Sequence, residues 1–202
     1  YDLLMGAPLI AWFVYVMIGL RPVLAEYARD LLAEPGNLMF NLRFFGYLAA
    51  AAFAFLNIAM IVMRSTPVLR SRGSLPRAFA VAGTFLGVGI NHLTPVALPI
   101  GWASMAFALI LLGSAGSVIA LGNLGKSFSI MPEARVLVTI GPYAYARHPL
   151  YAVEAITVIG VVMQHQQPWA GLLGIAVLAL QVTRSIFEEQ VLSEACPEYA
   201  AY

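Results

Sequence analysis

The 202 residues of this chain are too apolar for a water-soluble domain: apolar residues make up 61% of the sequence, charged residues only 10%, and the mean hydropathy is +0.83. Soluble domains carry about 25% charged residues, so the composition predicts an integral membrane protein. The net charge is +1, and we expect no nucleic-acid partner. The single cysteine, Cys196, excludes an internal disulfide.

Six apolar segments are each near the length of about 20 residues that a membrane-spanning helix needs. They fall at about 3–20, 44–63, 78–98, 100–121, 150–164 and 168–187. No positive region precedes the first segment, so we interpret it as a membrane span and not as a cleaved signal peptide. The sequence thus predicts an all-α polytopic membrane protein with a single domain over residues 1–202.

The connections between these segments differ in length and polarity. The connection at about 21–43 is long and rich in charged residues, and residues 27–32 within it are a candidate interfacial helix. Proline marks tight turns at 99–101 and 164–168. We therefore expect the last two helices to form a hairpin.

Lysine and arginine are distributed unequally between the two ends of the predicted helices. By helix count, one end carries Arg64, Arg70, Arg72, Arg77, Lys126, Arg135, Arg147 and Arg184, and the other carries Arg21, Arg29 and Arg43. Cytoplasmic loops of membrane proteins carry the excess of these residues. We therefore expect the larger set, both termini and the 122–147 connection to be cytosolic.

The polar residues of the C-terminal half gather at one end of the last two helices. Residues 141–151 contain an arginine, a histidine and three tyrosines directly before the fifth apolar segment. Pro149 suits the first turn of a helix, whose free amides attract a carboxylate or phosphate. Arg184 and Glu188, four residues apart, share one face of the last helix. This pattern predicts a catalytic or cofactor site at the membrane surface, the alternative being arginines and tyrosines that only anchor the helices there.

Two further features allow both a structural and a functional interpretation. Glu154 lies one turn into the fifth segment, where it either pairs with a buried arginine or contacts the substrate or cofactor. The spacing of Gly113 and Gly116 favours a helix-packing face; together with Gly122 and Gly125 they would alternatively form a glycine-rich cofactor loop. The three histidines are far apart in sequence and predict no metal site.

Three separated elements resemble the isoprenylcysteine carboxyl methyltransferase family and the related phospholipid methyltransferases. In order, they are Leu137-Val138-Thr139 with Gly141-Pro142-Tyr143, then Arg147-His148-Pro149-Leu150-Tyr151, and finally Glu188-Glu189 after an apolar hairpin. The resemblance covers about residues 113–202, which we expect to form a methyltransferase core, and leaves residues 1–112 without an assigned role. Two residues after the motif tyrosine, this chain has Val153 where the family usually has glycine.

The resemblance implies an S-adenosylmethionine-dependent methyltransferase with its cofactor pocket at the cytosolic end of the last helices, and we expect a bacterial inner membrane protein. It implies that Arg184 meets the substrate and, with Glu188, is catalytic. Glu154 is a further candidate for substrate binding. The cofactor-binding residues that it implies are Leu137, Val138, Tyr143, His148, Pro149, Leu150, Tyr151, Glu188 and Glu189.

The acceptor expected from this resemblance is a lipophilic small molecule or a lipidated substrate among the membrane lipids. An isoprenylcysteine-type carboxylate, a lipid amine and a thiol remain open as the methylated group. The competing hypothesis is an NADPH-dependent membrane reductase of the sterol-reductase type, although Lys126, Arg135 and Arg147 offer few cations for the phosphates of NADPH. A channel or transporter is a third hypothesis, which the one-sided polar cluster disfavours.

Overall fold

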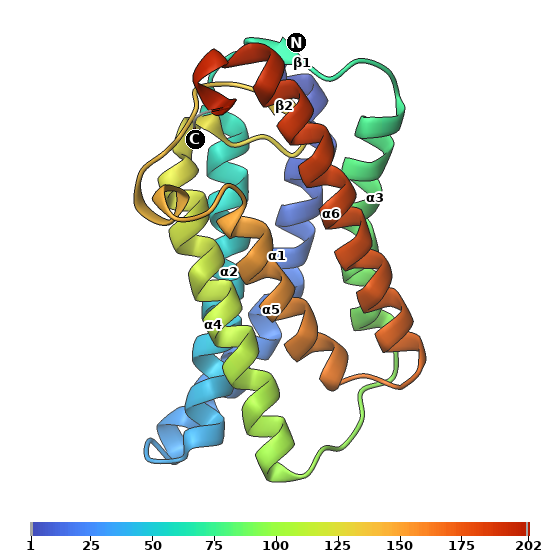
Figure 1. The fold of residues 1–202 in the computed structure, drawn as a ribbon. Coiled ribbons are helices and arrows are strands. Elements are labelled where there is room, and N and C mark those ends of the chain that lie inside the picture. The colour runs from blue at the N-terminus through green and yellow to red at the C-terminus, as the bar shows by residue number, and fades with distance from the viewer. Residues whose placement is uncertain (1, 201) are drawn as a thin grey trace.

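The computed structural model describes residues 2–200 and 202. Its helices run roughly side by side and form one bundle (Figure 1). Across the described residues they are α1 (Asp2–Ala33), α2 (Leu38–Met63), α3 (Leu75–Gly89), α4 (Ile100–Leu124), α5 (Pro149–Met163) and α6 (Trp169–Ala195). Short 3-10 helices follow or connect them at Ile90–His92, Gly125–Ser127, Gly141–Ala144 and Pro197–Ala200.

The all-α membrane fold predicted from composition is confirmed. Four helices, α1, α2, α4 and α6, are long and apolar enough to cross a membrane. Each of the six predicted segments overlaps a helix, but α3 and α5 have only 15 residues each, fewer than the roughly 20 that a span needs.

Helix α1 corrects the prediction of a long first connection. It continues through Arg21 and Pro22 to Ala33, and α2 begins at Leu38, so that only a short turn joins the two helices. Asn37 caps α2, because its side-chain oxygen accepts a hydrogen bond from the backbone N–H of Met39 at 3.0 Å. Apart from Glu34, the charged residues predicted to lie in this connection belong to α1 or α2, since a helix that satisfies its own backbone hydrogen bonds need not stop where the sequence becomes polar.

The third and sixth predicted segments also differ from the structure in extent. Helix α3 ends at Gly89, and an extended connection over 93–99 replaces the predicted tight turn. This connection is held by the turn between α5 and α6, where the N–H of Val96 donates to the carbonyl of Gln164 at 2.9 Å. Helix α6 continues about two turns beyond its apolar part, to Ala195. The expected α5–α6 hairpin is present (Figure 1).

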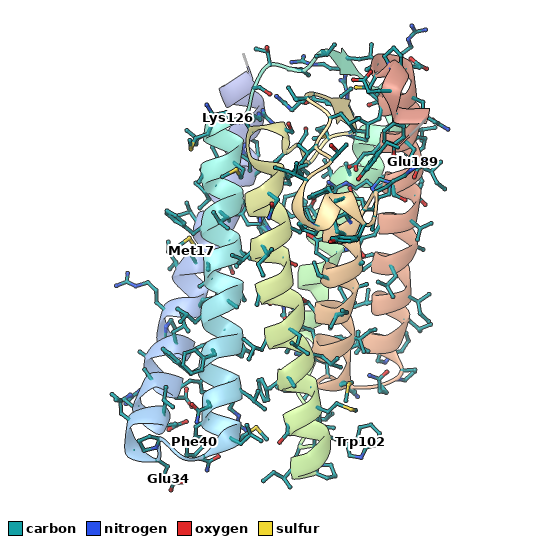
Figure 2. The ribbon with its side chains drawn as sticks, turned by 60° about the vertical axis from the view of Figure 1, so that its left-hand side comes forward. Met17, Glu34, Phe40, Trp102, Lys126 and Glu189 are labelled. Atoms are coloured by element: carbon teal, nitrogen blue, oxygen red, sulfur yellow. The ribbon has the colours of Figure 1, made fainter. Side chains whose placement is uncertain are left out.

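Both chain ends and the two short strands lie at the same end of the bundle, here called the site end (Figure 1). Strand β1 (Leu69–Arg70) pairs antiparallel with β2 (Glu133–Ala134), and this pairing joins the two long connections that were predicted to lie on one side of the membrane. Lys126 and Glu189 lie at the site end, whereas Glu34 and Trp102 lie at the opposite end (Figure 2).

Glycines of α4 bring it close to α5 below the site end. A Cβ atom on Gly116 would lie 2.8 Å from Cγ1 of Val153, and one on Gly113 would lie 2.7 Å from the backbone oxygen of Val153. Gly122 and Gly125 meet nothing within 4 Å. These distances support the packing interpretation for Gly113 and Gly116, and they show that α4 supplies the small residues that accommodate Val153.

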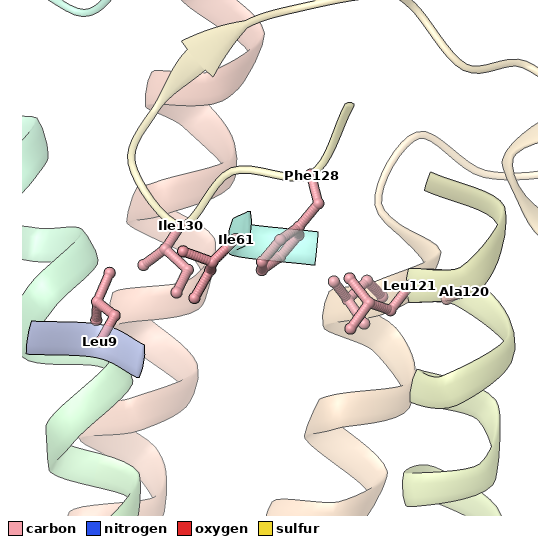
Figure 3. Packing of buried hydrophobic residues seen from close by; sticks show 7 residues of the cluster. Leu9, Ile61, Ala120, Leu121, Phe128 and Ile130 are labelled. Carbon is pink, nitrogen blue, oxygen red and sulfur yellow. The ribbon is translucent and has the colours of Figure 1, made fainter. Parts of the chain in front are cut away.

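A buried apolar cluster lies where α1, α2, α4 and α5 meet below the site end (Figure 3). Its members are Leu9, Ile61, Ala120, Leu121, Phe128, Ile130 and Leu150. Phe128 and Leu150 also line the pocket described below, so the cluster forms the floor of that pocket. The four helices therefore fix the position of the pocket floor.

Candidate active site

A pocket at the site end lies between the 124–138 connection, the start of α5 and the last turns of α6. The space between its walls, with the open mouth included, is about 760 Å³. The predicted site residues that line it are Leu137, Val138, Tyr143, His148, Leu150, Tyr151, Arg184 and Glu188. The pocket thus brings together predicted site residues that lie up to 51 positions apart, from Leu137 to Glu188.

Glu188 joins α6 to the start of α5. The hydroxyl of Tyr151 donates a hydrogen bond to Oε1 of Glu188 at 2.5 Å, and Nε of Arg184 lies 3.6 Å from the same oxygen. The guanidinium of Arg184 also lies over the Tyr151 ring, 5.2 Å from its centre. Arg184 is 9% exposed, so a buried cation is here held by a carboxylate and an aromatic face.

Glu189 makes a second connection between the same two elements, outside the pocket lining. Nε2 of His148 lies 3.1 Å from Oε1 of Glu189, and Nη1 of Arg147 lies 3.9 Å from its other oxygen. The His148 ring stacks on that of Tyr151, with 5.6 Å between ring centres. Glu188 and Glu189 therefore bind Tyr151 and His148, whose rings stack on one another at the start of α5.

Pro149 and Glu154 also lie outside the pocket lining. Pro149 is the first residue of α5 and is buried there, as its position in the sequence predicts. Oε2 of Glu154 accepts a hydrogen bond from Nε2 of Gln181 on α6 at 2.9 Å, and Arg184 is close enough to interact with Glu154 electrostatically. Glu154 thus lies between α5 and α6 beside the pocket.

Sequence reasoning missed two walls of the pocket. One is the 127–136 segment, where Arg135 is 3% exposed and its Nη2 lies 2.7 Å from Oε2 of Glu133. The alternation of Glu133 and Arg135, which places both on one face of an extended strand, is the signal that would have pointed to it. The second wall comes from the chain after α6, which contributes Tyr199 and Tyr202.

Tyr143, which lines the pocket from the 3-10 helix Gly141–Ala144, has a neutral side chain. Burial raises the pKa of the Tyr143 hydroxyl well above its ordinary value, and the negative charges of Glu188 and Glu154 raise it further. The hydroxyl of Tyr202 donates to the backbone carbonyl of Tyr143 and, at 3.3 Å, to that of Ala146. Tyr143 is therefore an uncharged aromatic wall at neutral pH.

Helices long and apolar enough to span a membrane, with a polar pocket at one end of the bundle, define an integral membrane protein with a candidate active site at that end. The model of the family described as phospholipid methyltransferase matches residues 96–198, half of the chain. The chain belongs to the phospholipid methyltransferase family, a family of methyltransferases. No curated protein is similar enough to this chain to count as a match. The family match includes α4, α5 and α6 with all of the pocket-lining residues except Tyr199 and Tyr202.

Proposed function

We propose that this protein transfers a methyl group from S-adenosylmethionine to a lipophilic acceptor at the cytosolic surface of the membrane. The observation that carries this proposal is the pocket itself: the 147–151 stretch and Glu188 meet at the membrane-surface end of a bundle that belongs to a methyltransferase family. Family membership supports the reaction class, and the lining of the pocket supports the cofactor.

The residues of the pocket fit this cofactor chemically. Its carboxylate suits the free amides at the start of α5 and the side chain of Arg147, which both favour an anion. Its sulfonium cation suits the aromatic faces of Tyr143 and Tyr151. Leu137 and Val138 offer apolar contact to the adenine ring. When bound, the cofactor supplies an electrophilic methyl group.

The protein residues around it align the acceptor and exclude water, which are the main requirements of an in-line displacement. Tyr151 and Glu188 hold Arg184 in place, so its guanidinium can bind an acceptor head group in a fixed position. A guanidinium binds a carboxylate with two parallel hydrogen bonds, which supports a carboxylate acceptor.

The surface of α6 supports a lipophilic acceptor. Val182 is 61% exposed and Ile186 is 52% exposed, and they flank Arg184 in the sequence. In a membrane-spanning helix, such exposed apolar side chains face lipid. The lipid-facing surface thus reaches the level of Arg184, so an acceptor can remain in the bilayer while its head group approaches the pocket.

We expect the protein, purified in detergent, to bind S-adenosylhomocysteine and not NADPH. The aromatic and apolar lining suits a nucleoside with a single carboxylate, whereas the phosphates of NADPH need more cations than the pocket supplies. Isothermal titration calorimetry with each compound measures this directly. Binding of NADPH without binding of S-adenosylhomocysteine would move the assignment to a membrane reductase.

We further expect the site end to face the cytosol. Tyr145 is 93% exposed in the connection just before α5, and Glu34 is exposed at the end of the bundle opposite to the site end (Figure 2). In a Cys196→Ser background, a membrane-impermeant maleimide should label Glu34→Cys in intact cells and Tyr145→Cys only after permeabilisation. The reverse labelling pattern would contradict both the orientation and cofactor access from the cytosol.

A further inference from the structure

The segment after α6 forms a wall of the pocket and is fixed at both ends. Its short 3-10 helix, Pro197–Ala200, begins directly after Cys196, whose N–H donates to the carbonyl of Leu192 at 2.8 Å. Beyond this helix, the Tyr202 hydroxyl donates hydrogen bonds to the backbone carbonyls of Tyr143 and Ala146. These two residues lie in and just after the 3-10 helix Gly141–Ala144. Tyr199 is therefore held against the pocket and is only 3% exposed.

The Tyr199 hydroxyl is buried without a hydrogen-bond partner among the residues that the structure describes. The ring is already in contact with neighbours: the guanidinium of Arg147 lies 5.1 Å from its centre, and the Tyr202 ring lies 6.0 Å away. A buried hydroxyl without a partner is unfavourable, because it has lost its hydrogen bonds to water and gained none. The hydroxyl is thus the group of Tyr199 that is available to a bound molecule.

We propose that Tyr199 is a cofactor-binding residue whose hydroxyl donates a hydrogen bond to the carboxylate of S-adenosylmethionine. This inference rests on the proposed function and assigns a specific contact within it. The carboxylate is the anionic group of that cofactor, and Arg147, stacked on the same ring, provides the positive charge that favours an anion beside the hydroxyl. The nearest anionic partner of Arg147, Glu189, is 3.9 Å away, which leaves the guanidinium able to attract a second carboxylate.

The protonation state agrees with a donor role. Burial, followed by the negative charge of Glu189, raises the pKa of Tyr199 to about 12, although Arg147 lowers it. The phenol therefore keeps its proton across the physiological pH range.

The test compares the wild-type protein with Tyr199→Phe and, as a matched control, Tyr145→Phe. Tyr145 is 93% exposed and does not line the pocket. Two ligands are titrated calorimetrically: S-adenosylhomocysteine, which carries the carboxylate, and methylthioadenosine, which lacks the amino-acid part. We expect Tyr199→Phe to weaken S-adenosylhomocysteine binding about tenfold or more, because a charge-assisted hydrogen bond is lost, and to leave methylthioadenosine binding unchanged. The Tyr145→Phe control should bind both ligands like the wild type.

Thermal unfolding without ligand separates a binding role from a structural one. If the hydroxyl has no protein partner, Tyr199→Phe should unfold at the same or a higher temperature than the wild type. A lower unfolding temperature with unchanged affinity would show that the hydroxyl stabilises the protein and would overturn the inference. Equal weakening of both ligands would overturn the assignment to the carboxylate. Because both ligands are measured on one preparation, partial unfolding of the variant cannot mimic a selective loss.

The outcomes also separate this inference from the proposed function. If the wild-type protein does not bind S-adenosylhomocysteine, the proposed function fails and the inference fails with it. If the wild type binds and Tyr199→Phe binds equally well, only the role of Tyr199 is wrong.

Discussion

Arg184→Lys is expected to lower methyl transfer by about 100-fold while S-adenosylhomocysteine affinity stays within about twofold of wild type. Arg184 lies over the Tyr151 ring and beside Glu188, which fixes the plane of its guanidinium. A lysine ammonium cannot form two parallel hydrogen bonds to an acceptor carboxylate, and misplacing a reacting group by about 1 Å costs on the order of 10² in rate. Glu188→Gln should mainly weaken cofactor binding, because its negative charge borders the pocket that receives the sulfonium cation.

The measurement is transfer of radioactive methyl groups from S-adenosylmethionine to two acceptors of different chemistry. One is a prenylated cysteine in detergent, which offers a carboxylate, and the other is phosphatidylethanolamine in vesicles, which offers an amine. Arg77→Lys is the matched control, since Arg77 is exposed and does not line the pocket. A carboxylate acceptor predicts strong loss with the first substrate, whereas activity with the amine alone would exclude carboxylate methylation.

The competing hypothesis is that Arg184 and Glu188 are only a structural ion pair. A double-mutant cycle on turnover, affinity and unfolding temperature distinguishes the two. If both single variants and the double variant lower the unfolding temperature alike, with turnover per folded molecule intact, the pair stabilises the fold and has no role in the reaction.

Gly113→Ala is expected to lower the unfolding temperature of the detergent-solubilised protein by roughly 5–10 °C, or to prevent folding. The added Cβ atom would lie 2.6 Å from the backbone nitrogen of Thr157 and 2.7 Å from the backbone oxygen of Val153. Backbone atoms of α5 cannot move aside without shifting the helix, and overpacking costs about 1–3 kcal/mol or more. The start of α5, which carries the site residues, should shift with it.

Gly122→Ala, on the same helix, is the matched control for this prediction. A Cβ atom on Gly122 meets nothing within 4 Å, so this variant should unfold at the same temperature or a higher one, because alanine favours helix by about 1 kcal/mol over glycine. Thermal unfolding monitored by circular dichroism compares the two. Equal stability of both variants would show that α4 and α5 do not pack as closely as described.

Much of the membrane architecture could be predicted because its signals are local. Composition indicated the bilayer, and apolar length placed α4 and α5 within about three residues of their observed bounds. The start of α5 at Pro149 followed from the backbone chemistry of proline. The end of α1 at Ala33 could not be predicted in this way, because hydropathy reports where a helix leaves an apolar environment and not where its hydrogen bonds end.

The composition of the candidate site depended on contacts that no local pattern contains. The sequence by itself determined that this is a membrane protein and that the 147–151 stretch resembles a methyltransferase motif. Only the tertiary structure placed Tyr199 in the pocket and paired Glu188 with Tyr151 and Glu189 with His148. Likewise, Gly113 and Gly122 are the same residue type on the same helix, and they differ because Val153 and Thr157 of α5 lie opposite Gly113 only. The physical reason is that helix propensity and hydropathy act over a few residues, whereas the partner of a side chain is chosen by how distant helices pack.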